Sequence, residues 1–301
     1  MNSFLQANVL FALASALLWG GADFAGGMGV KRAGGTLGAA LRVVLLSHAA
    51  SFVVLLTIAL AKGDARPHGA VLAWGLTAGI ASGLSLTCFY MALARGAMGA
   101  SAAVSGLLAA AIPAVMALAS QGSPGALRLG GFLVAGIAIW LIAIAPASGQ
   151  ASHPATRNDR ASKATMTLAI VSGVGFGIYF VALKMAGSIG LVWPMATARI
   201  GSLTVCSLLM LVVTVRGSDL HARLTKRAAV WALSTALMDT SGNLLFIAAT
   251  RAGRLDIAAV LASLYPASTI VLAAGVLGER LSRRQKIGMG IAAVAIAMIS
   301  L

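Results

Sequence analysis

Apolar runs follow one another along almost the whole chain, separated by short polar stretches. Each run is roughly 20 residues long, the length that lets a helix cross the hydrocarbon core of a bilayer. Of all residues, 59% are hydrophobic and 10% are charged, whereas about 25% are charged in a typical soluble domain. We therefore expect an all-α polytopic membrane protein, not a large soluble helical domain. The predicted transmembrane helices, about ten, cover residues 9–30, 36–61, 70–94, 100–120, 127–146, 165–187, 191–215, 228–250, 255–277 and 287–301.

A short motif occurs twice, about half a chain length apart. Residues 92–104 read ALARGAMGASAAV, and residues 248–260 read AATRAGRLDIAAV. About five predicted spans separate the copies, and an odd number of crossings turns the second copy upside down relative to the first. Such inverted repeats are typical of alternating-access transporters. We expect two inverted five-helix repeats, residues 1–147 and 165–301, joined by a polar linker over residues 148–164.

Two aspartates and two arginines lie inside predicted spans. A charge at the bilayer centre costs about 2.5–3.5 kcal/mol on insertion scales, so each should face a partner or a cavity. Asp239 lies near the middle of its span, and Asn243 follows one turn later on the same helix face. A carboxylate and an amide side by side can coordinate a cation, hold a proton or bind an amine. Asp239 is the strongest site candidate, with a structural ion pair or an interhelical hydrogen bond as the alternative.

Asp23 lies in the glycine-rich stretch WGGADFAGG, residues 19–27. The glycines permit close helix contact or local unwinding around the acid, and a shallow interfacial aspartate is the alternative. Arg42 and Arg199 occupy equivalent spans of the two halves. Either could hold an anionic group of a substrate or neutralise an aspartate. We favour a structural ion pair for Arg42 and leave the role of Arg199 open.

Three further side chains are weaker candidates for binding substrate or ions. His48 lies in the middle of an apolar span, where hydrogen-bonded packing is favoured over proton relay. Tyr90 and Tyr265 flank the repeated motif, and packing is favoured over stacking on a substrate.

Glycines and prolines indicate how the spans pack and bend. Gly75, Gly79 and Gly83 recur every four residues on one helix face, a spacing that lets two helix backbones approach closely. Pro113 and Pro266 lie within spans, where proline removes a helical hydrogen bond and permits a kink.

The sequence carries no recognisable catalytic or nucleotide-binding motif. It has no His-Glu-x-x-His, no phosphate-binding Gly-rich loop with a lysine and no cluster spaced like metal ligands. We therefore expect no enzyme activity, no cofactor and no metal, and energy from an ion gradient or exchange. The net charge of +15 is spread over many short loops, where anionic lipid headgroups meet it. The expected partners are a small-molecule substrate and the lipid bilayer, not nucleic acid, and a homodimer remains open.

Four stretches together resemble the EamA family of the drug/metabolite transporter superfamily. They are WGGADF (19–24), MDTSGN (238–243), AAVLASLYP (258–266) and LGERLS (277–282). The similarity extends over nearly the whole chain. It implies ten helices in two inverted five-helix repeats, a central cavity lined by both halves, and movement of small metabolites across the bacterial inner membrane. The first half lacks a counterpart of the LGERLS stretch, which favours a loop-closing role for Glu279.

We therefore expect a secondary active transporter in the cell (inner) membrane, with export favoured. Its substrates would be small metabolites such as amino acids, their derivatives or drugs. It would work by alternating access with proton coupling or exchange. A passive channel or scramblase is the alternative, followed by a membrane-embedded transferase.

The orientation in the membrane can be tested directly. The loops numbered odd in chain order hold 14 Lys and Arg residues, and the even loops hold 6. Basic loops stay in the cytoplasm, which would put both termini outside. The EamA resemblance implies cytoplasmic termini, and we favour that topology. A topology reporter fused to the C-terminus should then signal from the cytoplasm, and the same reporter placed in residues 148–164 should signal from the opposite side. The reverse pair of signals would contradict the prediction.

Overall fold

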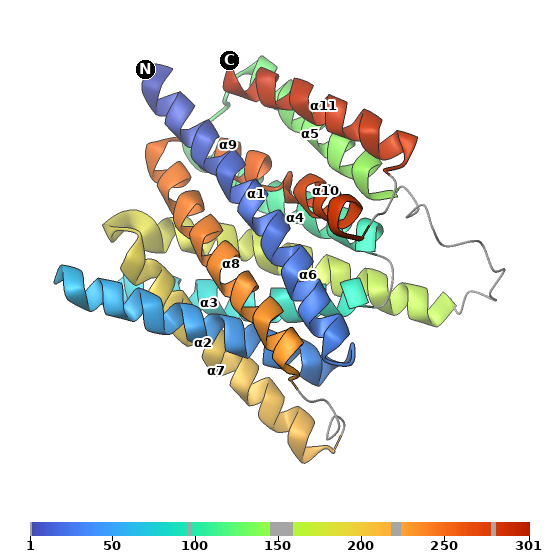
Figure 1. Cartoon of the computed structure of the whole chain (residues 1–301). Coiled ribbons are helices and arrows are strands. Elements are labelled where there is room, and N and C mark those ends of the chain that lie inside the picture. The colour runs from blue at the N-terminus through green and yellow to red at the C-terminus, as the bar shows by residue number, and fades with distance from the viewer. Residues whose placement is uncertain (1, 95–97, 145–158, 218–223, 278–280) are drawn as a thin grey trace.

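The computed structural model describes residues 2–94, 98–144, 159–217, 224–277 and 281–301. Within these ranges the chain is a bundle of helices without strands (Figure 1). The elements are α1 (Asn2–Arg32), α2 (Leu37–Lys62), α3 (Gly69–Ala94), α4 (Met98–Gln121), α5 (Ala126–Ile144), α6 (Asp159–Ala186), the 3-10 turn η1 (Gly187–Ile189), α7 (Val192–Val215), α8 (Lys226–Ala252), α9 (Leu255–Ala262), α10 (Tyr265–Leu277) and α11 (Arg283–Ser300).

Every predicted span coincides with helix in the structure, with two differences. Helix α6 begins at Asp159, so residues 159–164, the last six of the predicted linker, are helical. The remainder of the predicted linker, the arginine of the first motif copy (Arg95) and Glu279 lie outside the described residues. The second difference is that the span predicted over 255–277 is divided into α9 and α10.

The interruption between α9 and α10 is explained by Pro266. Ser263 and Leu264 form a turn, and the amide of Ala267 donates to the carbonyl of Leu264. Proline has no N–H to donate and its ring clashes with a preceding helical turn, so it is best accommodated in the first turn of a new helix. Pro113 lies inside the uninterrupted helix α4. The two prolines therefore have different local effects.

Seven stretches in the described part of the chain are long and apolar enough to cross a membrane. Helix α5 contributes a shorter apolar stretch, Ala126–Ile142. Helix α8 is not counted because Asp239, Asn243 and the basic residues at its ends lower its hydropathy, and α11 begins with several basic residues. The count of about ten spans thus stays a prediction. The seven are Gln6–Arg32, Leu37–Lys62, Gly69–Leu93, Val104–Gln121, Lys163–Ile189, Val192–Val215 and Leu255–Val276.

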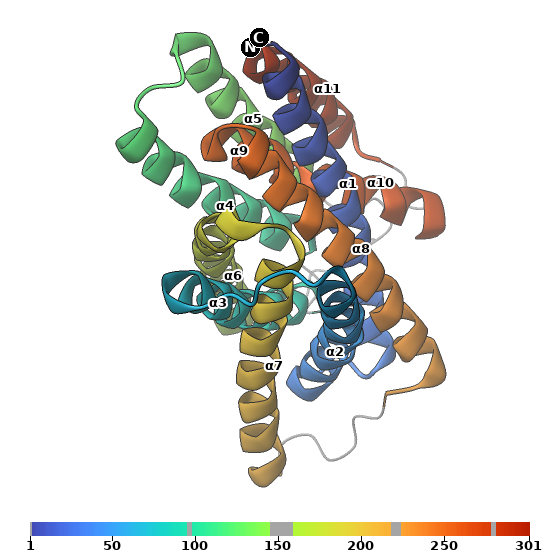
Figure 2. The ribbon, with the colours of Figure 1, turned by 90° about the vertical axis from the view of Figure 1, so that its left-hand side faces the viewer.

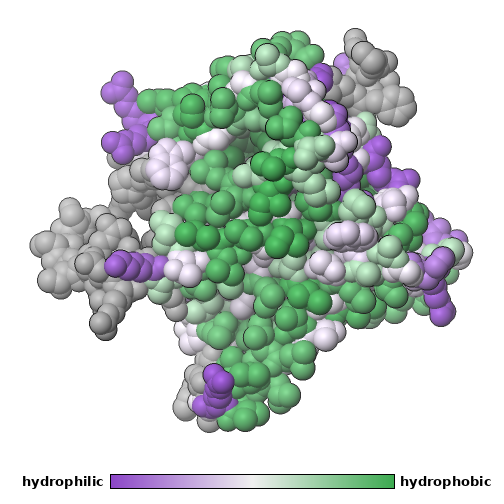
Figure 3. All heavy atoms as spheres, turned by 180° about the vertical axis from the view of Figure 1, so that it is seen from behind, coloured by the Kyte–Doolittle hydropathy of each residue, from purple (hydrophilic) through white to green (hydrophobic). Residues whose placement is uncertain are grey.

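The outer surface of the bundle is strongly apolar. In the view of Figure 3, hydrophobic residues cover the centre of the face and hydrophilic ones lie toward its edges. Leu133, Leu237 and Val215 are more than 70% exposed. A soluble monomer rarely exposes contiguous apolar surface on this scale, so this surface suits contact with lipid.

The helices pair across the two halves of the chain. Helix α1 packs along α8, α3 packs along α6, and α5 pairs with α11 at one side of the bundle (Figures 1 and 2). The start of α1 and the end of α11 lie at the same end of the bundle (Figures 1 and 2). The core therefore consists of contacts between segments that are far apart in sequence.

Polar contacts hold one end of the bundle together. Arg254 forms an ion pair with Asp256 at 2.7 Å and donates to the carbonyl of Gly122, also at 2.7 Å. The amide of Asn8 donates to the carbonyl of Ala249 at 2.8 Å. These bonds tie the first turns of α1 and the α4–α5 turn to the connection between α8 and α9.

The three glycines spaced by four residues on α3 lie against α7. Gly75 faces Thr197, Gly79 faces the carbonyl of Ala198, and Gly83 faces Cys206. A Cβ atom at Gly79 would overlap that carbonyl oxygen. The close approach of α3 and α7 therefore requires glycine at this position.

We predict that Gly79→Ala lowers the free energy of unfolding by about 1–3 kcal/mol, the usual cost of overpacking a core. The thermal unfolding midpoint of the purified protein in detergent measures this. Gly290→Ala is the matched control, because nothing lies within 4 Å of a Cβ at that helical glycine. Equal midpoints for the two variants would contradict the packing role.

Candidate functional site

A small cavity lies at the centre of the bundle, between α1, α3, α6, α8 and α10. Its volume is about 30 Å³. Roughly 10–15 Å³ holds one water molecule, so the cavity can hold about two waters or a small cation. It is lined by Trp19, Asp23, Ser82, Leu86, Phe176, Tyr179, Phe180, Asp239, Asn243 and Tyr265.

One of the two acids, Asp239, has a buried arginine as its partner. Arg199 of α7 is 1% exposed, and its Nη2 atom forms an ion pair with Asp239 of α8. The same Nη2 atom lies 3.3 Å from the hydroxyl oxygen of Thr240. Arg199 therefore neutralises Asp239 from behind the cavity wall and joins α7 to α8.

The other terminal nitrogen of Arg199 binds His48 of α2. Nη1 of Arg199 lies 2.9 Å from Nε2 of His48, and Nδ1 of His48 lies 2.7 Å from the hydroxyl of Ser202. Arginine can only donate, so Nε2 accepts and the ring proton of a neutral His48 is on Nδ1. The hydroxyl of Ser202 in turn donates to the carbonyl of Arg199 at 3.1 Å. His48 thus acts as a neutral acceptor that positions the guanidinium.

The second acid, Asp23, has no such partner. Asp23 is 7% exposed and lines the cavity. It has no hydrogen bond or ion pair with any residue that the structure describes, although it lies near enough to Asp239 for the two carboxyl groups to interact electrostatically. Two carboxyl groups therefore share one cavity while a single arginine pairs with one of them.

Helix α1 carries Asp23 into the cavity without unwinding. The helix is continuous through its glycines, which permit close contacts with three neighbouring helices. Gly20 lies against Ser268 of α10, Gly21 against Met238 of α8 and Gly26 against Tyr90 of α3. Of the two effects predicted for these glycines, the structure has the close packing.

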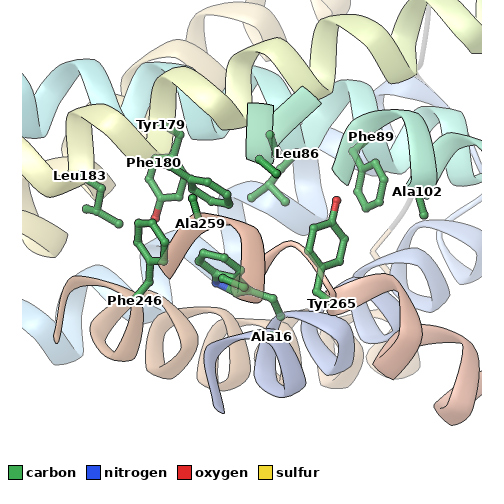
Figure 4. Close-up of a cluster of buried hydrophobic side chains, with 14 of the residues drawn as sticks. Ala16, Leu86, Phe89, Ala102, Tyr179, Phe180, Leu183, Phe246, Ala259 and Tyr265 are labelled. Atoms are coloured by element: carbon green, nitrogen blue, oxygen red, sulfur yellow. The ribbon is translucent and has the colours of Figure 1, made fainter. Parts of the chain in front are cut away.

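An aromatic cluster forms one wall of the cavity. The rings of Trp19 and Phe180 stack with centroids 5.0 Å apart, and Phe180 and Phe246 are 4.7 Å apart. Figure 4 shows Phe180 and Phe246 pointing toward one another from facing helices. The indole N–H of Trp19 donates to the side-chain oxygen of Asn243 at 2.9 Å. That bond fixes the Asn243 amide and leaves its nitrogen without a hydrogen bond among the described residues.

The structure brings together four of the eight predicted binding residues as cavity lining: Asp23, Asp239, Asn243 and Tyr265. The hydroxyl of Tyr265 lies beside Gly106, and its ring meets the ring of Phe89 edge to face.

The other four do not line the cavity. Arg199 and His48 support Asp239 from behind, and Tyr90 packs on Gly26. The ion pair favoured for Arg42 is absent from the described residues. Its Nη1 is instead buried without a hydrogen-bond partner there.

Six lining residues were not predicted: Trp19, Ser82, Leu86, Phe176, Tyr179 and Phe180. A signal for three of them was present in the sequence. Phe176, Tyr179 and Phe180 are spaced by three and four residues, so they share one face of α6. Ser82 and Leu86 are ordinary residues for an apolar helix and carried no signal.

No group of three or more His, Cys, Asp or Glu side chains in the described ranges is arranged to hold a metal ion. The polar groups that reach the cavity are instead two carboxyls, one amide and hydroxyls. This set suits a proton, a monovalent cation or an organic ammonium group.

Comparisons with known proteins agree with the fold. The EamA-like transporter family matches residues 163–301, so the resemblance to EamA inferred from the sequence is confirmed over the second half. In all, 21 chains of solved structures match. One, titled only as the crystal structure of a protein, has a TM-score of 0.68 and 16% identity and covers 97% of this chain and 96% of its own. A likeness at this identity supports the fold alone. No curated protein matches.

The pairing of Arg199 with Asp239 leads to a stability prediction. Arg199→Met should lower the free energy of unfolding by about 3–5 kcal/mol, because it leaves a buried carboxylate unpaired. Adding Asp239→Asn should recover part of that loss, since the unpaired charge is then gone. Thermal unfolding in detergent measures both. Arg42→Met is the control, because Arg42 has no ion pair among the described residues, and a loss as large as that of Arg199→Met would contradict the assignment.

Proposed function

From the match of residues 163–301 to the EamA-like transporter family, we propose that the whole chain is a secondary active transporter of small metabolites. Amino acids, their derivatives and drugs are the candidate substrates, and the cell (inner) membrane is its location. It works by alternating access, coupled to protons or to exchange, with export as the favoured direction. A multi-pass membrane protein of this family has no need of a catalytic site for that task.

The observation that carries the proposal is the cavity with two carboxyl groups at the centre of an apolar bundle. Asp23 and Asp239 come from α1 and α8, which belong to opposite halves of the chain. Ionisable groups inside a membrane are expensive, and those that face a cavity typically mark a substrate or ion pathway. The position of Asp23 and Asp239 in this cavity therefore supports the proposal that they bind a transported cation or proton.

The two acids differ in whether a cation neutralises them, and this difference suggests different roles. Asp239 is compensated by Arg199. Asp23 has no such partner among the described residues, and an unpaired carboxylate in an apolar site is costly. It becomes neutral only with a proton or with a cationic ligand. We therefore assign to Asp23 the exchange of a proton for the positively charged group of a substrate, and to Asp239 a supporting charge.

The ten-helix inverted repeat belongs to the same proposal, and the helix pairing supports it. If α1–α5 correspond in order to α6, α7, α8, the divided helix α9–α10, and α11, then the pair α1–α8 has α6–α3 as its counterpart. The pair α4–α6 likewise has α9–α10 with α1 as its counterpart, and α2–α7 and α5–α11 are their own counterparts. Arg42 and Arg199, 157 residues apart, occupy corresponding helices α2 and α7.

The size of the cavity favours a transporter over an open pore. A volume of about 30 Å³ is too small for an amino acid, and Trp19, Phe180 and Phe246 pack together at its wall. A metabolite enters only if helices move apart. This conformation is therefore assigned to an occluded state of the cycle.

We predict that Asp23→Asn abolishes coupled uptake without weakening the fold. Proteoliposomes with a pH gradient and a panel of radiolabelled amino acids and amines measure the uptake. For every compound that the wild type takes up, uptake by the variant should fall to the level of protein-free vesicles. Asp64→Asn is the control, since Asp64 is exposed outside the bundle, and it should retain the wild-type rate.

We predict that Asp239→Asn also abolishes uptake. Unlike Asp23→Asn, it should in addition lower the thermal unfolding midpoint. It leaves the guanidinium of Arg199 buried without its carboxylate. Wild-type uptake by Asp23→Asn would overturn the proposed role of Asp23. An unchanged midpoint for Asp239→Asn would overturn the division of roles between the two acids.

A further inference from the structure

A second, larger hollow lies at one end of the bundle and is basic where the central cavity is acidic. It has a volume of about 520 Å³ and lies between the start of α3, the end of α6 with η1, and the end of α8. Its charged lining residues are Lys184 and Arg251, and no acid lines it in the part of the chain that the structure describes. We call it the basic groove.

The two cations of the groove are available to a ligand. Nη1 of Arg251 donates to the carbonyls of Gly187 and Ser188 at 2.6 and 3.0 Å. Those bonds fix the guanidinium and leave its other nitrogens without partners among the described residues. Lys184 is half-buried and has no hydrogen bond or ion pair there. The acid that acts on it electrostatically, Asp256, is itself paired with Arg254.

The groove lies over the central cavity along the same helices. Lys184 follows Phe180 by one turn of α6, and Thr250 follows Asn243 by two turns of α8. At a rise of about 1.5 Å per residue these separations are roughly 6 and 10 Å. Phe180 lines the central cavity, and Phe246, which contacts it, lies between Asn243 and Thr250 along α8. The acidic central cavity and the basic groove therefore follow one another along α6 and α8.

One wall of the groove is apolar. Val71 and Trp74 of α3 and Met185 of α6 line it, and Trp74 is 37% exposed. Two cations beside an apolar wall match an amphipathic anion, because lysine and arginine bind carboxylate and phosphate oxygens through charge-assisted hydrogen bonds. We propose that Lys184 and Arg251 bind the carboxylate or phosphate group of an organic anion whose apolar part lies along Trp74.

Two kinds of ligand carry such an anionic group beside an apolar part: a soluble organic anion and an anionic phospholipid. The groove lies at the end of the helices, where either ligand can reach it. The proposed site does not depend on transport by the chain. It is tested by binding to the purified protein, so its failure and the failure of the proposed function are separate results.

The experiment measures the thermal unfolding midpoint of the full chain in detergent with three added probes: octanoate, dioleoylphosphatidylglycerol and, as the uncharged-headgroup control, dioleoylphosphatidylcholine. A ligand that binds the native state raises the midpoint in proportion to its occupancy. The variants are Lys184→Gln and Lys184→Arg, with Lys62→Gln as the matched control. Lys62 is also basic, ends α2 and is exposed, but does not line the groove.

We expect octanoate or phosphatidylglycerol, but not phosphatidylcholine, to stabilise the wild type. Lys184→Gln should weaken the apparent affinity about tenfold, the effect of losing one charge-assisted hydrogen bond, and Lys184→Arg should retain it. Stabilisation by octanoate identifies a soluble anion as the source, and stabilisation by phosphatidylglycerol alone identifies a lipid. Equal weakening in Lys62→Gln, or no stabilisation by either anion, overturns the site.

Discussion

The guanidinium group of Arg199 is buried between α2, α7 and α8, and the centre of the molecule supplies acceptors for its two terminal nitrogens, whereas its Nε has no hydrogen-bond partner among the described residues. Arg199 finds one acceptor on each neighbouring helix, His48 on α2 and Asp239 on α8. Both bonds join segments that no local sequence preference would bring together. Without them the charge would be far too costly in an apolar bundle. Because Arg199 pairs with Asp239, Asp23 is left without a partner among the described residues. Asp23 is therefore the carboxyl group of the cavity that is not already paired.

Much of this arrangement could be predicted because length and hydropathy alone define membrane helices. Asp239, Asn243 and Asp23 could be selected because a charge inside a span is costly wherever it points. Which partner each charge finds could not be predicted, since it depends on helix rotation. Periodicity is a poor guide to rotation when a helix is apolar all round. For that reason the ion pair was expected at Arg42, whereas the structure forms it at Arg199.

The aromatic lining was missed for a related reason. The spacing of Phe176 and Phe180 places them on one face of α6, but the sequence does not say what that face meets. In the structure Phe180 contacts Trp19 of α1 and Phe246 of α8, and Phe176 meets Phe89 of α3 edge to face. The glycines of α1 also determine the shape of the cavity. Because Gly20, Gly21 and Gly26 have no side chain, α1 lies directly against α10, α8 and α3. Close packing on several sides of one helix therefore produces a narrow cavity with polar and aromatic walls in place of a wide channel.

The division of one span into α9 and α10 affects how the chain enters the bilayer during synthesis. Eight residues of α9 and 13 of α10 correspond to helices of roughly 12 and 20 Å at 1.5 Å per residue. Neither reaches across a hydrocarbon core about 30 Å thick. The insertion machinery must therefore accept both pieces together. The amides of Ser263 and Leu264 donate to the carbonyls of Ala259 and Leu261, and the carbonyl of Leu264 accepts from the amide of Ala267, so the turn keeps these peptide groups bonded inside the hydrocarbon core. The helices that α9 packs against most closely, α1 and α4, precede it in the chain and are therefore synthesised before it.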